Sequence, residues 1–223
     1  MAAHKRINKN FFKKWSKEMA YVVGFFAADG YMTVNKRGGQ YWSMDIGDRK
    51  FIDQIKKVIH SEHKISVRKR NGGQYTTYRL QIGSIEMCDD LRKLGFKERK
   101  THSLSIPKVP NEYFSDFVRG YFDGDGNVWS GLMRKGKNTS TLSIRTVFTS
   151  CSLKFLEEMM RQLEVFGVIR GVLTKGRSNY YRLTYSVKNS LKLYDFMYNG
   201  LDASTLFLKR KRDVFEEYIK MRL

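Results

Sequence analysis

Two hydrophobic periods alternate along the chain and predict the same series of elements twice. A helix that ends at Asp-Gly precedes two strands, a second helix, two further strands and a closing helix, so each half follows the order αββαββα. The first strand pairs are predicted at 31–36 and 40–47 and at 127–134 and 141–149, the second helices from about 49 and 152, and the closing helices at 84–94 and 188–199. A last, basic helix is predicted from Leu206 to Met221.

The second strand pair of each half has one apolar face and one polar face, because successive side chains on a strand point to opposite sides. In the first half Ile65, Val67, Tyr78, Leu80 and Ile82 alternate with Arg68, Arg70, Arg79 and Gln81. In the second half Tyr181, Leu183 and Tyr185 alternate with Arg182, Thr184 and Ser186. The apolar faces predict a core beneath helices, and the basic faces predict a surface left open to an anionic partner.

A direct internal repeat supports this duplicated architecture. The segment from Tyr21 to Gly30 matches the segment from Phe117 to Gly126, and shorter matches follow in the same order in both halves. The two prolines of the chain, at 107 and 110, mark a linker. We therefore predict an N-terminal half at 1–105, a linker at 106–112 and a C-terminal half at 113–223. Each half is predicted to be an α+β unit with a four-stranded antiparallel sheet.

Charge narrows the choice of partner. Lys and Arg number 42 against 22 Asp and Glu, a formal net charge of +20, which a compact protein tolerates best when an anionic partner screens it. Nucleic acid is the first candidate and a membrane is not expected, because no stretch approaches the ~18 continuous apolar residues of a membrane span. Cys88 and Cys151 lack the nearby Cys or His of a zinc site.

The two repeated helices carry small residues at matching places. Gly24 and Ala28 in the first helix, like Gly120 and Gly124 in the second, are four residues apart and therefore share one helical face. Small side chains on such a face let two helices approach closely enough for backbone contact. These four residues therefore predict the interface between the two helices.

Each repeated helix also ends with a carboxylate. Asp29 and Asp125 fall in the last turn, before Gly30 and Gly126, which we expect to stop the helices in a left-handed conformation. A carboxylate at the negative end of a helix dipole, beside a second carboxylate, is unfavourable without a cation. Hard oxygen ligands suit Mg²⁺, which retains waters and accepts phosphate oxygens.

The two Asp-Gly segments have two other interpretations, a simple helix cap and a calcium-binding loop. A single Asp-Gly often does no more than cap a helix into a turn, but two copies in register favour a shared site. The segment 123–127 also resembles the start of a calcium-binding EF-hand loop. That loop needs Gly at its sixth position and Glu at its twelfth, where this chain has Val128 and Arg134.

The repeated segments Val22–Gly30 and Val118–Gly126 resemble the nine-residue LAGLIDADG motif, which names a family of homing endonucleases and related intron maturases. The resemblance implies metal-dependent hydrolysis of DNA, with Asp29 and Asp125 as metal ligands and Ala28 and Gly124 at the metal site. It implies Mg²⁺ or Mn²⁺ as cofactor, with Ca²⁺ binding without supporting cleavage.

The resemblance also implies a basic residue beside each metal site, where it would polarise water or stabilise the charged transition state. Lys100 lies where the family places such a lysine, and Lys211 is its counterpart in the repeat. A solvated or phosphate-holding role is nearly as well supported for Lys211, because it lies within a run of basic residues; Lys97 and Lys209 are alternates.

The motif departs from the family pattern at two places. The first acidic position is Ala27 in one copy and Asp123 in the other, while the second acid is present in both. Arg119 takes a place that is usually small or apolar, so we expect this part of the helix to reach solvent or an acidic neighbour.

An open, basic sheet face in each half predicts a saddle over DNA, because the major groove is wide enough for a β-ribbon. Two unequal halves imply a monomer on a long, asymmetric target that is cut on both strands. Candidates for guanine or phosphate contacts are Arg68, Arg70, Arg79, Arg134, Arg145, Lys175, Arg177 and Arg182. Candidates for reading adenine or other bases are Gln40, Gln74, Gln81 and Thr184.

Other functions on the same scaffold stay open. An intron maturase would bind RNA instead, and a silent DNA-binding regulator would lack cleavage, although the intact Asp29 and Asp125 favour cleavage. The chain starts at Met1 and ends at Leu223 without the terminal residues that protein splicing requires, so an intein-embedded enzyme is not expected. We expect an intracellular protein, in the cytoplasm, the nucleoid or an organelle, and not a secreted one.

Overall fold

The computed structural model describes the chain except for residues 1–4, 71–73, 99–102, 135, 137–138 and 203, and its elements follow the predicted order. The first half consists of α1 (Lys17–Asp29), β1 (Gly30–Val34), β2 (Gln40–Ile46), α2 (Arg49–Val58), β3 (Ile65–Arg70), β4 (Tyr75–Gly83) and α3 (Ile85–Lys93). The second half consists of η3 (Asn111–Tyr113), α4 (Phe114–Asp125), β5 (Gly126–Arg134), β6 (Ser140–Ser150), α5 (Leu153–Val165), β7 (Val172–Lys175), β8 (Tyr181–Tyr185) and α6 (Val187–Tyr198), and α7 (Lys209–Lys220) follows.

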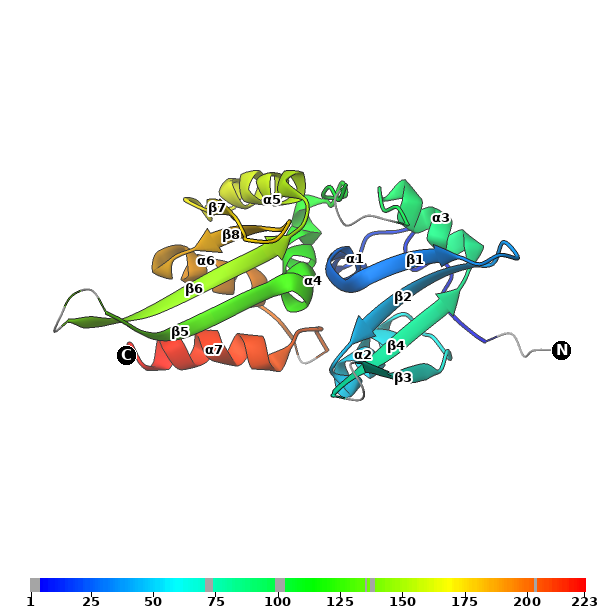
Figure 1. Ribbon diagram of the computed structural model, residues 1–223, viewed down its shortest axis with the longest axis horizontal. Helices are drawn as coiled ribbons and strands as arrows, with labels where there is room; N and C mark the ends of the chain where they lie inside the picture. The colour runs from blue at the N-terminus through cyan, green and yellow to red at the C-terminus, as the bar shows by residue number, and fades with distance from the viewer. Residues whose placement is uncertain (1–4, 71–73, 99–102, 135, 137–138, 203) are drawn as a thin grey trace.

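Each half contains one antiparallel four-stranded sheet, and α1 and α4 lie between the two sheets (Figure 1). The strand order is β1-β2-β4-β3 in the first sheet and β5-β6-β8-β7 in the second, so corresponding strands occupy corresponding places. The predicted fold class is confirmed: the molecule is α+β, with a duplicated αββαββα unit. None of the described helices is long and apolar enough to span a membrane.

Local sequence explains where four of the helices begin. The side chains of Ser16, Asp48, Ser84 and Ser152 each accept a hydrogen bond from the backbone N–H three residues later, at 3.1–3.3 Å. Such a cap satisfies one of the backbone donors that the first turn of a helix leaves unpaired. The second helix of each half therefore starts directly after Asp48 or Ser152, within a residue of its predicted position.

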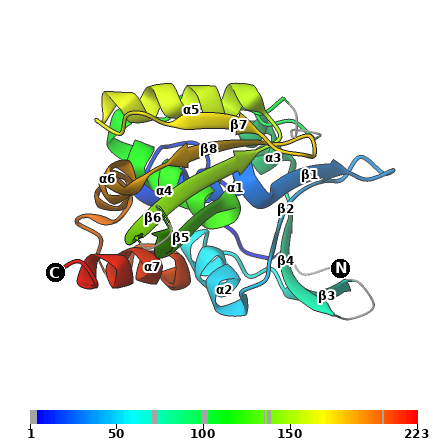
Figure 2. The same cartoon turned by 60° about the vertical axis from the view of Figure 1, so that its left-hand side comes forward.

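The core of each half lies on the side of the sheet that the helices cover. Trp42, Met44, Leu80 and Ile82 are fully buried on this face of the first sheet, and corresponding residues are buried in the second. Helices α5 and α7 run along opposite edges of the second sheet (Figure 2). The other side of each sheet is called the open face below.

The predicted apolar face fails at one position. Val67 shares the helix-covered register of Tyr78, but it is 56% exposed. Strand β3 is at the edge of its sheet, so Val67 has a neighbouring strand on one side only. Alternation predicts which side of a strand faces the core and does not predict how far the covering helices extend.

The backbones of α1 and α4 touch at the predicted small residues. A Cβ atom added to Gly24 would lie 2.1 Å from the carbonyl oxygen of Phe117, and one added to Gly120 would lie 2.0 Å from the carbonyl oxygen of Tyr21. Real Cβ atoms do not come so close to backbone, so no other residue fits at either place without moving the helices apart. The predicted interface is therefore present in the structure.

The expected left-handed helix stops are absent, and that prediction was wrong. Gly30 and Gly126 have φ of −84° and −87° and ψ of 156° and 158°, so both are extended and pass directly into a strand. Glycine is needed for space instead: a Cβ would lie 2.0 Å from the ring of Phe26 at Gly30, and 2.2 Å from the ring of Phe122 at Gly126.

Arg119 has an acidic neighbour but does not reach solvent. Its side chain is 1% exposed and pairs with Asp116 at 2.5 Å. The other guanidinium nitrogens donate to the carbonyl oxygens of Met197 and Leu206 at 2.9 and 3.0 Å, and the group lies 5.4 Å from the ring of Tyr21. Arg119 thus ties α4 to α1, to α6 and to the segment before α7, a set of partners that are distant in the sequence.

Gly120→Ala tests the backbone contact between α1 and α4. We expect a loss of about 1–3 kcal/mol of stability, because the new methyl group must displace the Tyr21 carbonyl, and a fall in Tm of roughly 3–10 °C. Gly47→Ala is the control, since a Cβ there meets nothing within 4 Å. Thermal unfolding measures both variants, and equal Tm values would contradict the close approach of the helices.

Candidate active site and nucleic-acid-binding surface

The repeated aspartates meet where the two central helices end. Asp29 is the last residue of α1 and Asp125 the last of α4, and both side chains are exposed. A Cβ added to Gly124 would lie 2.3 Å from the Cβ of Ala28 and 3.3 Å from Oδ2 of Asp29. The Asp29 carboxylate therefore lies beside the residue that precedes Asp125, at the negative ends of two adjacent helix dipoles.

The negative charges of both aspartates affect the pKa of Tyr121, which lies one turn before the end of α4. Burial raises the pKa of its hydroxyl well above the usual value, and the nearby charges of Asp125 and Asp29 raise it further. The hydroxyl donates to the carbonyl oxygen of Thr149 at 2.7 Å. Tyr121 is therefore a neutral, buried tyrosine close to the two carboxylates.

The two exposed carboxylates suit a hard divalent cation. Across the described residues, no group of three or more His, Cys, Asp or Glu side chains is placed to hold a metal. Mg²⁺ commonly binds through only one or two carboxylates, together with waters and phosphate oxygens of the substrate. Two exposed carboxylates at touching helix ends match that requirement.

The second copy of the motif has a buried acid that the first copy lacks. Asp123 is 2% exposed; it accepts a hydrogen bond from the hydroxyl of Tyr21 at 2.7 Å and from the backbone N–H of Leu208 at 2.9 Å. Burial raises the pKa of its carboxyl to about 6, while these two donors act in the opposite direction. Asp123 joins α4 to α1 and to the start of α7, and Ala27 at the corresponding place offers no such bond.

Lys211 is buried at the end of α4. Its Nζ donates to the carbonyl oxygens of Phe122, Asp123 and Gly126 at 2.6, 2.9 and 2.6 Å, and it lies 5.1 Å from the ring of Phe122. An ammonium group has three donors, so all of them are used. Burial lowers the pKa of Lys211 to about 8, partly opposed by the charges of Asp123, Asp29 and Asp125.

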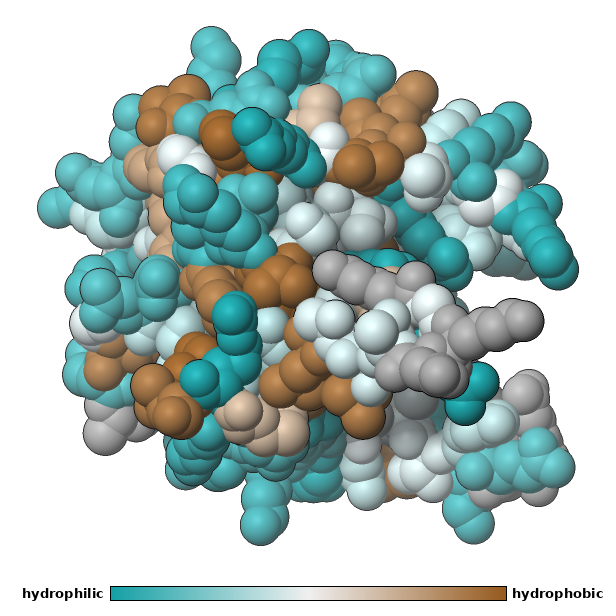
Figure 3. Space-filling view, turned by 90° about the vertical axis from the view of Figure 1, so that its left-hand side faces the viewer, coloured by the Kyte–Doolittle hydropathy of each residue, from teal (hydrophilic) through white to brown (hydrophobic). Residues whose placement is uncertain are grey.

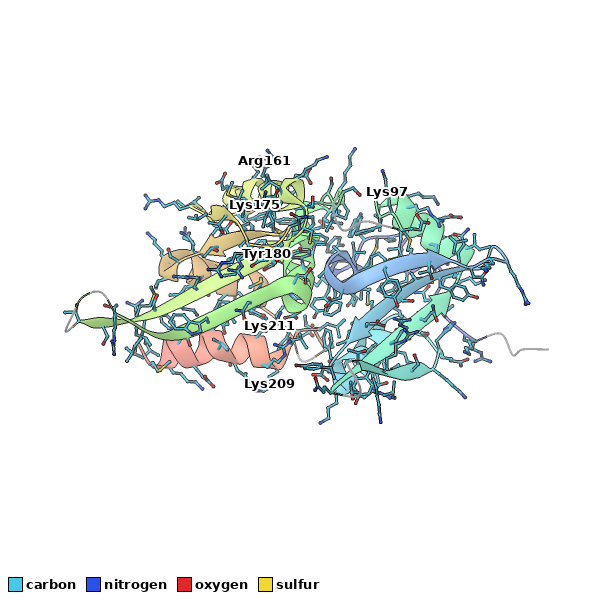
Figure 4. All side chains as sticks on the ribbon, viewed as in Figure 1. Lys97, Arg161, Lys175, Tyr180, Lys209 and Lys211 are labelled. Carbon is cyan, nitrogen blue, oxygen red and sulfur yellow. The ribbon has the colours of Figure 1, made fainter. Side chains whose placement is uncertain are left out.

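Lys211 is therefore not a solvated lysine. It satisfies carbonyl groups that the end of a helix leaves unpaired, and it places a positive charge behind the carboxylates. Figure 4 shows Lys211 on the side of α7 toward β5 and Lys209 on the far side. Lys209 is 81% exposed and pairs with Asp213, and Lys97 is exposed, whereas Lys100 lies outside the described residues.

A groove of about 610 Å³ borders Asp29. It runs between the loop after β2 and the start of α7, and its walls contribute Arg49, Lys50 and Arg210 as well as Asp45 and Asp48. Mixed charges of this kind suit an anionic group that arrives with a cation. No sequence pattern assigns Arg210 to this site, because only the fold brings the first turn of α7 beside the first half.

The open faces hold part of the predicted DNA-contact set. The strand register places Arg68, Arg79 and Gln81 on the open face of the first sheet, and Arg145, Arg182 and Thr184 on that of the second. Arg70 has the same register as Arg68. These positions fit the predicted contact surface.

The guanidinium of Arg79 already has a partner. It makes two hydrogen bonds to the carboxylate of Asp45, at 2.5 and 2.6 Å, and lies 5.2 Å from the ring of Tyr31. Asp45 stands directly opposite Arg79 on the neighbouring strand. The pair cancels one positive charge on the open face, which the alternation of residues within one strand did not reveal.

The other residues predicted to contact DNA do not lie on the open faces. Gln40 and Lys175 share the register of the helix-covered face, so they do not lie beside the other candidates on the open faces. Arg134 ends β5 in that same register, at the tip of the long β5-β6 hairpin, and Gln74 and Arg177 lie exposed in loops. Gln40 alternates in step with Trp42 and Met44, and Lys175 with Leu173, so both follow the apolar register of their strands.

Known proteins resemble this chain in sequence and in fold. The family model for a LAGLIDADG-like domain matches residues 16–95 and 112–196, one match in each half. The chain belongs to the LAGLIDADG family. A probable translation initiation factor IF-2 of Thermococcus kodakarensis is 30% identical over 166 residues, which are 66% of this chain and 13% of that protein. The chain thus spans a small part of that relative.

Solved LAGLIDADG proteins share the fold. One is I-SmaMI bound to uncleaved DNA target in the presence of calcium ions. Its sequence is 16% identical to this chain, the TM-score is 0.59, and the alignment covers 93% of this chain and 90% of that one. The LAGLIDADG homing endonuclease I-LtrWI bound to target DNA is 14% identical, with a TM-score of 0.60 and coverage of 96% and 90%. Each alignment therefore extends over both halves of this chain.

Lys211→Met tests how the end of the second LAGLIDADG helix is held. The carbonyl groups of Phe122, Asp123 and Gly126 would lose their donor, so we expect a loss of about 1–3 kcal/mol of stability. Lys209→Met is the control, because an exposed substitution usually changes stability by less than about 0.5 kcal/mol. Thermal unfolding without DNA or divalent ions is the measurement. Wild-type stability of Lys211→Met would refute the capping role.

Proposed function

We propose that this chain is a site-specific endonuclease for double-stranded DNA, and that Asp29 and Asp125 bind its divalent metal ions. The observation that carries the proposal is the meeting of these two carboxylates at the touching ends of α1 and α4. Carboxylates in this place repel each other and face two negative dipole ends. A bound divalent cation would relieve both penalties.

The DNA would lie across the open faces of the two sheets. The net charge of +20 favours a polyanion, and a β-ribbon fits the major groove. Arg68 on one sheet and Arg145 and Arg182 on the other would contact phosphates or guanines. Because the halves differ in sequence, one chain would bind a long asymmetric target as a monomer.

Divalent metal would supply Lewis-acid stabilisation of the scissile phosphate and an activated water for in-line hydrolysis. Mg²⁺ or Mn²⁺ suits the two carboxylates, with Ca²⁺ binding without supporting cleavage. We assign Ala28 and Gly124 to the same site, since they are in contact directly before the two aspartates.

The surrounding residues hold the carboxylates in place. Lys211 fixes the last turn of α4 through its three carbonyl contacts and brings a positive charge close to Asp125. Asp123 and Tyr21 lock the two helices together near their ends. We propose Lys100 as the basic residue that serves the first half.

Asp29→Asn and Asp125→Asn test the function directly. The wild-type chain is used to select a cleaved sequence from a randomised duplex library in Mg²⁺, and both variants are then assayed on that sequence. We expect each variant to lose double-strand cleavage while its affinity for the duplex stays within about threefold, because asparagine keeps the shape and loses the charge.

Asp89→Asn is the matched control, because this exposed aspartate on α3 is 51% accessible and lies outside the site. It should cleave at the wild-type rate. Full cutting by either test variant would contradict the assignment of the metal ligands. Failure of the wild type to cut any duplex, together with tight binding to a structured RNA, would favour the maturase function instead.

A further inference from the structure

The open faces of the two sheets differ in chemistry. On the first sheet, every described open-face side chain carries a hydrogen-bonding atom, apart from Gly83, which has no side chain. The second sheet has Val147, Val172 and Met133 in the same register, and Trp129 beside them. The two sheets therefore have the same strand order but different side chains on their open faces.

Three of these apolar residues line one groove of about 820 Å³. Val147 on β6 and Val172 on β7 are both paired with Thr184 of the strand between them, so they flank it across the sheet. Trp129 lies on β5, and a Cβ added to Gly131 would be 2.8 Å from its indole, so the ring leans along the strand. Val172 is 56% exposed and Trp129 is 45% exposed.

Cations surround this apolar strip. Arg145 stands opposite Trp129, and Arg170 and Arg182 line the same groove. The guanidinium of Arg182 donates to the hydroxyl of Tyr180 at 3.0 Å and lies 5.1 Å from its ring, which fixes its position beside the groove. The ligand that fits must therefore carry negative charge and small apolar groups together.

Double-stranded DNA carries both within its major groove. The 5-methyl group of thymine is the apolar group that base edges present there, between phosphates on either side. Uracil lacks this methyl group, and the major groove of an RNA duplex is too deep and narrow for side chains to read. A strip of valine and tryptophan among arginines matches thymine in DNA and has no counterpart in an RNA duplex.

Other exposed hydrophobic side chains among the described residues of this half lie away from the groove. Leu132 lies near the tip of the β5-β6 hairpin, and Val165, Phe166 and Ile169 lie at and after the end of α5. In the space-filling view of this end of the molecule, hydrophobic patches are separated by hydrophilic side chains (Figure 3). The strip on the open face is distinguished by its groove and its arginines.

We propose that the second sheet recognises its half-site through thymine methyl groups, bound by Val147, Val172 and Trp129, whereas the first sheet reads its half-site through hydrogen bonds. The inference rests on the proposed binding of double-stranded DNA and adds how one half-site is read. Strand β5 starts directly after Asp125, and Trp129 is its fourth residue. The thymines therefore belong to the inner part of the half-site, close to the point of cleavage.

Deoxyuridine substitution tests the proposal. The full chain first selects its preferred duplex from a randomised library by binding at fixed salt, and we expect thymines at inner positions of the half-site contacted by the second sheet. Each thymine is then replaced by deoxyuridine, which removes the methyl group and keeps the base pair. We expect about fourfold weaker binding for each contacted methyl and no change in the other half-site.

Val147→Thr and Val172→Thr identify the residues involved. Threonine keeps the branched shape suited to a strand and replaces a methyl group by a hydroxyl. Each variant should bind the thymine target more weakly and lose its sensitivity to deoxyuridine at one position. Val67→Thr is the control matched to Val172→Thr, because both valines are on edge strands and 56% exposed, but Val67 lies on the helix-covered register. It should keep the full deoxyuridine effect.

The outcomes separate this inference from the proposed function. A selected duplex that binds equally well with thymine or deoxyuridine in the inner half-site overturns the methyl contacts and leaves DNA binding intact. A deoxyuridine effect that persists unchanged in both valine variants overturns the assignment to these residues. If no duplex sequence is enriched at all, the proposed site-specific binding fails, and this inference fails with it.

Discussion

Backbone contact between α1 and α4 is the constraint on which the rest of the molecule depends. Gly24 and Gly120 each lie against a carbonyl oxygen of the facing helix, at a distance that leaves no room for a side chain. This contact fixes how far apart the two halves lie, because each helix leads directly into the first strand of its own sheet. The contact also brings together the ends of the two helices, where Asp29 and Asp125 lie.

Joining the helices so closely concentrates negative charge, and the structure balances that charge differently in the two halves. The second helix ends against Lys211, whose three donors are all taken by carbonyl groups, and its Asp123 is buried in hydrogen bonds to Tyr21 and Leu208. The first helix has Ala27 in place of Asp123. The two carboxylates therefore share one centre but not the same surroundings.

The same asymmetry continues into the sheets. Their backbones have equivalent strand orders, yet the first open face is polar and carries the Arg79–Asp45 pair, while the second combines arginines with an apolar strip. A duplicated fold preserves backbone geometry and leaves the exposed side chains free to diverge. Two unequal surfaces around one pair of carboxylates suit the asymmetric double-stranded target that we propose.

The sequence alone determined the order of elements, the duplication and the pairing of Asp29 with Asp125, because hydrophobic period and repeat are properties of neighbouring residues. Side-chain alternation also placed Arg68, Gln81 and Arg182 on the open faces, whereas Gln40 and Lys175 follow the register of the helix-covered faces. Only the tertiary structure decided the role of Lys211, the burial of Arg119 and the apolar strip around Val172. Each of these depends on contacts between segments far apart in the chain, and no local pattern encodes which backbone carbonyl, ring or strand will lie opposite a given side chain.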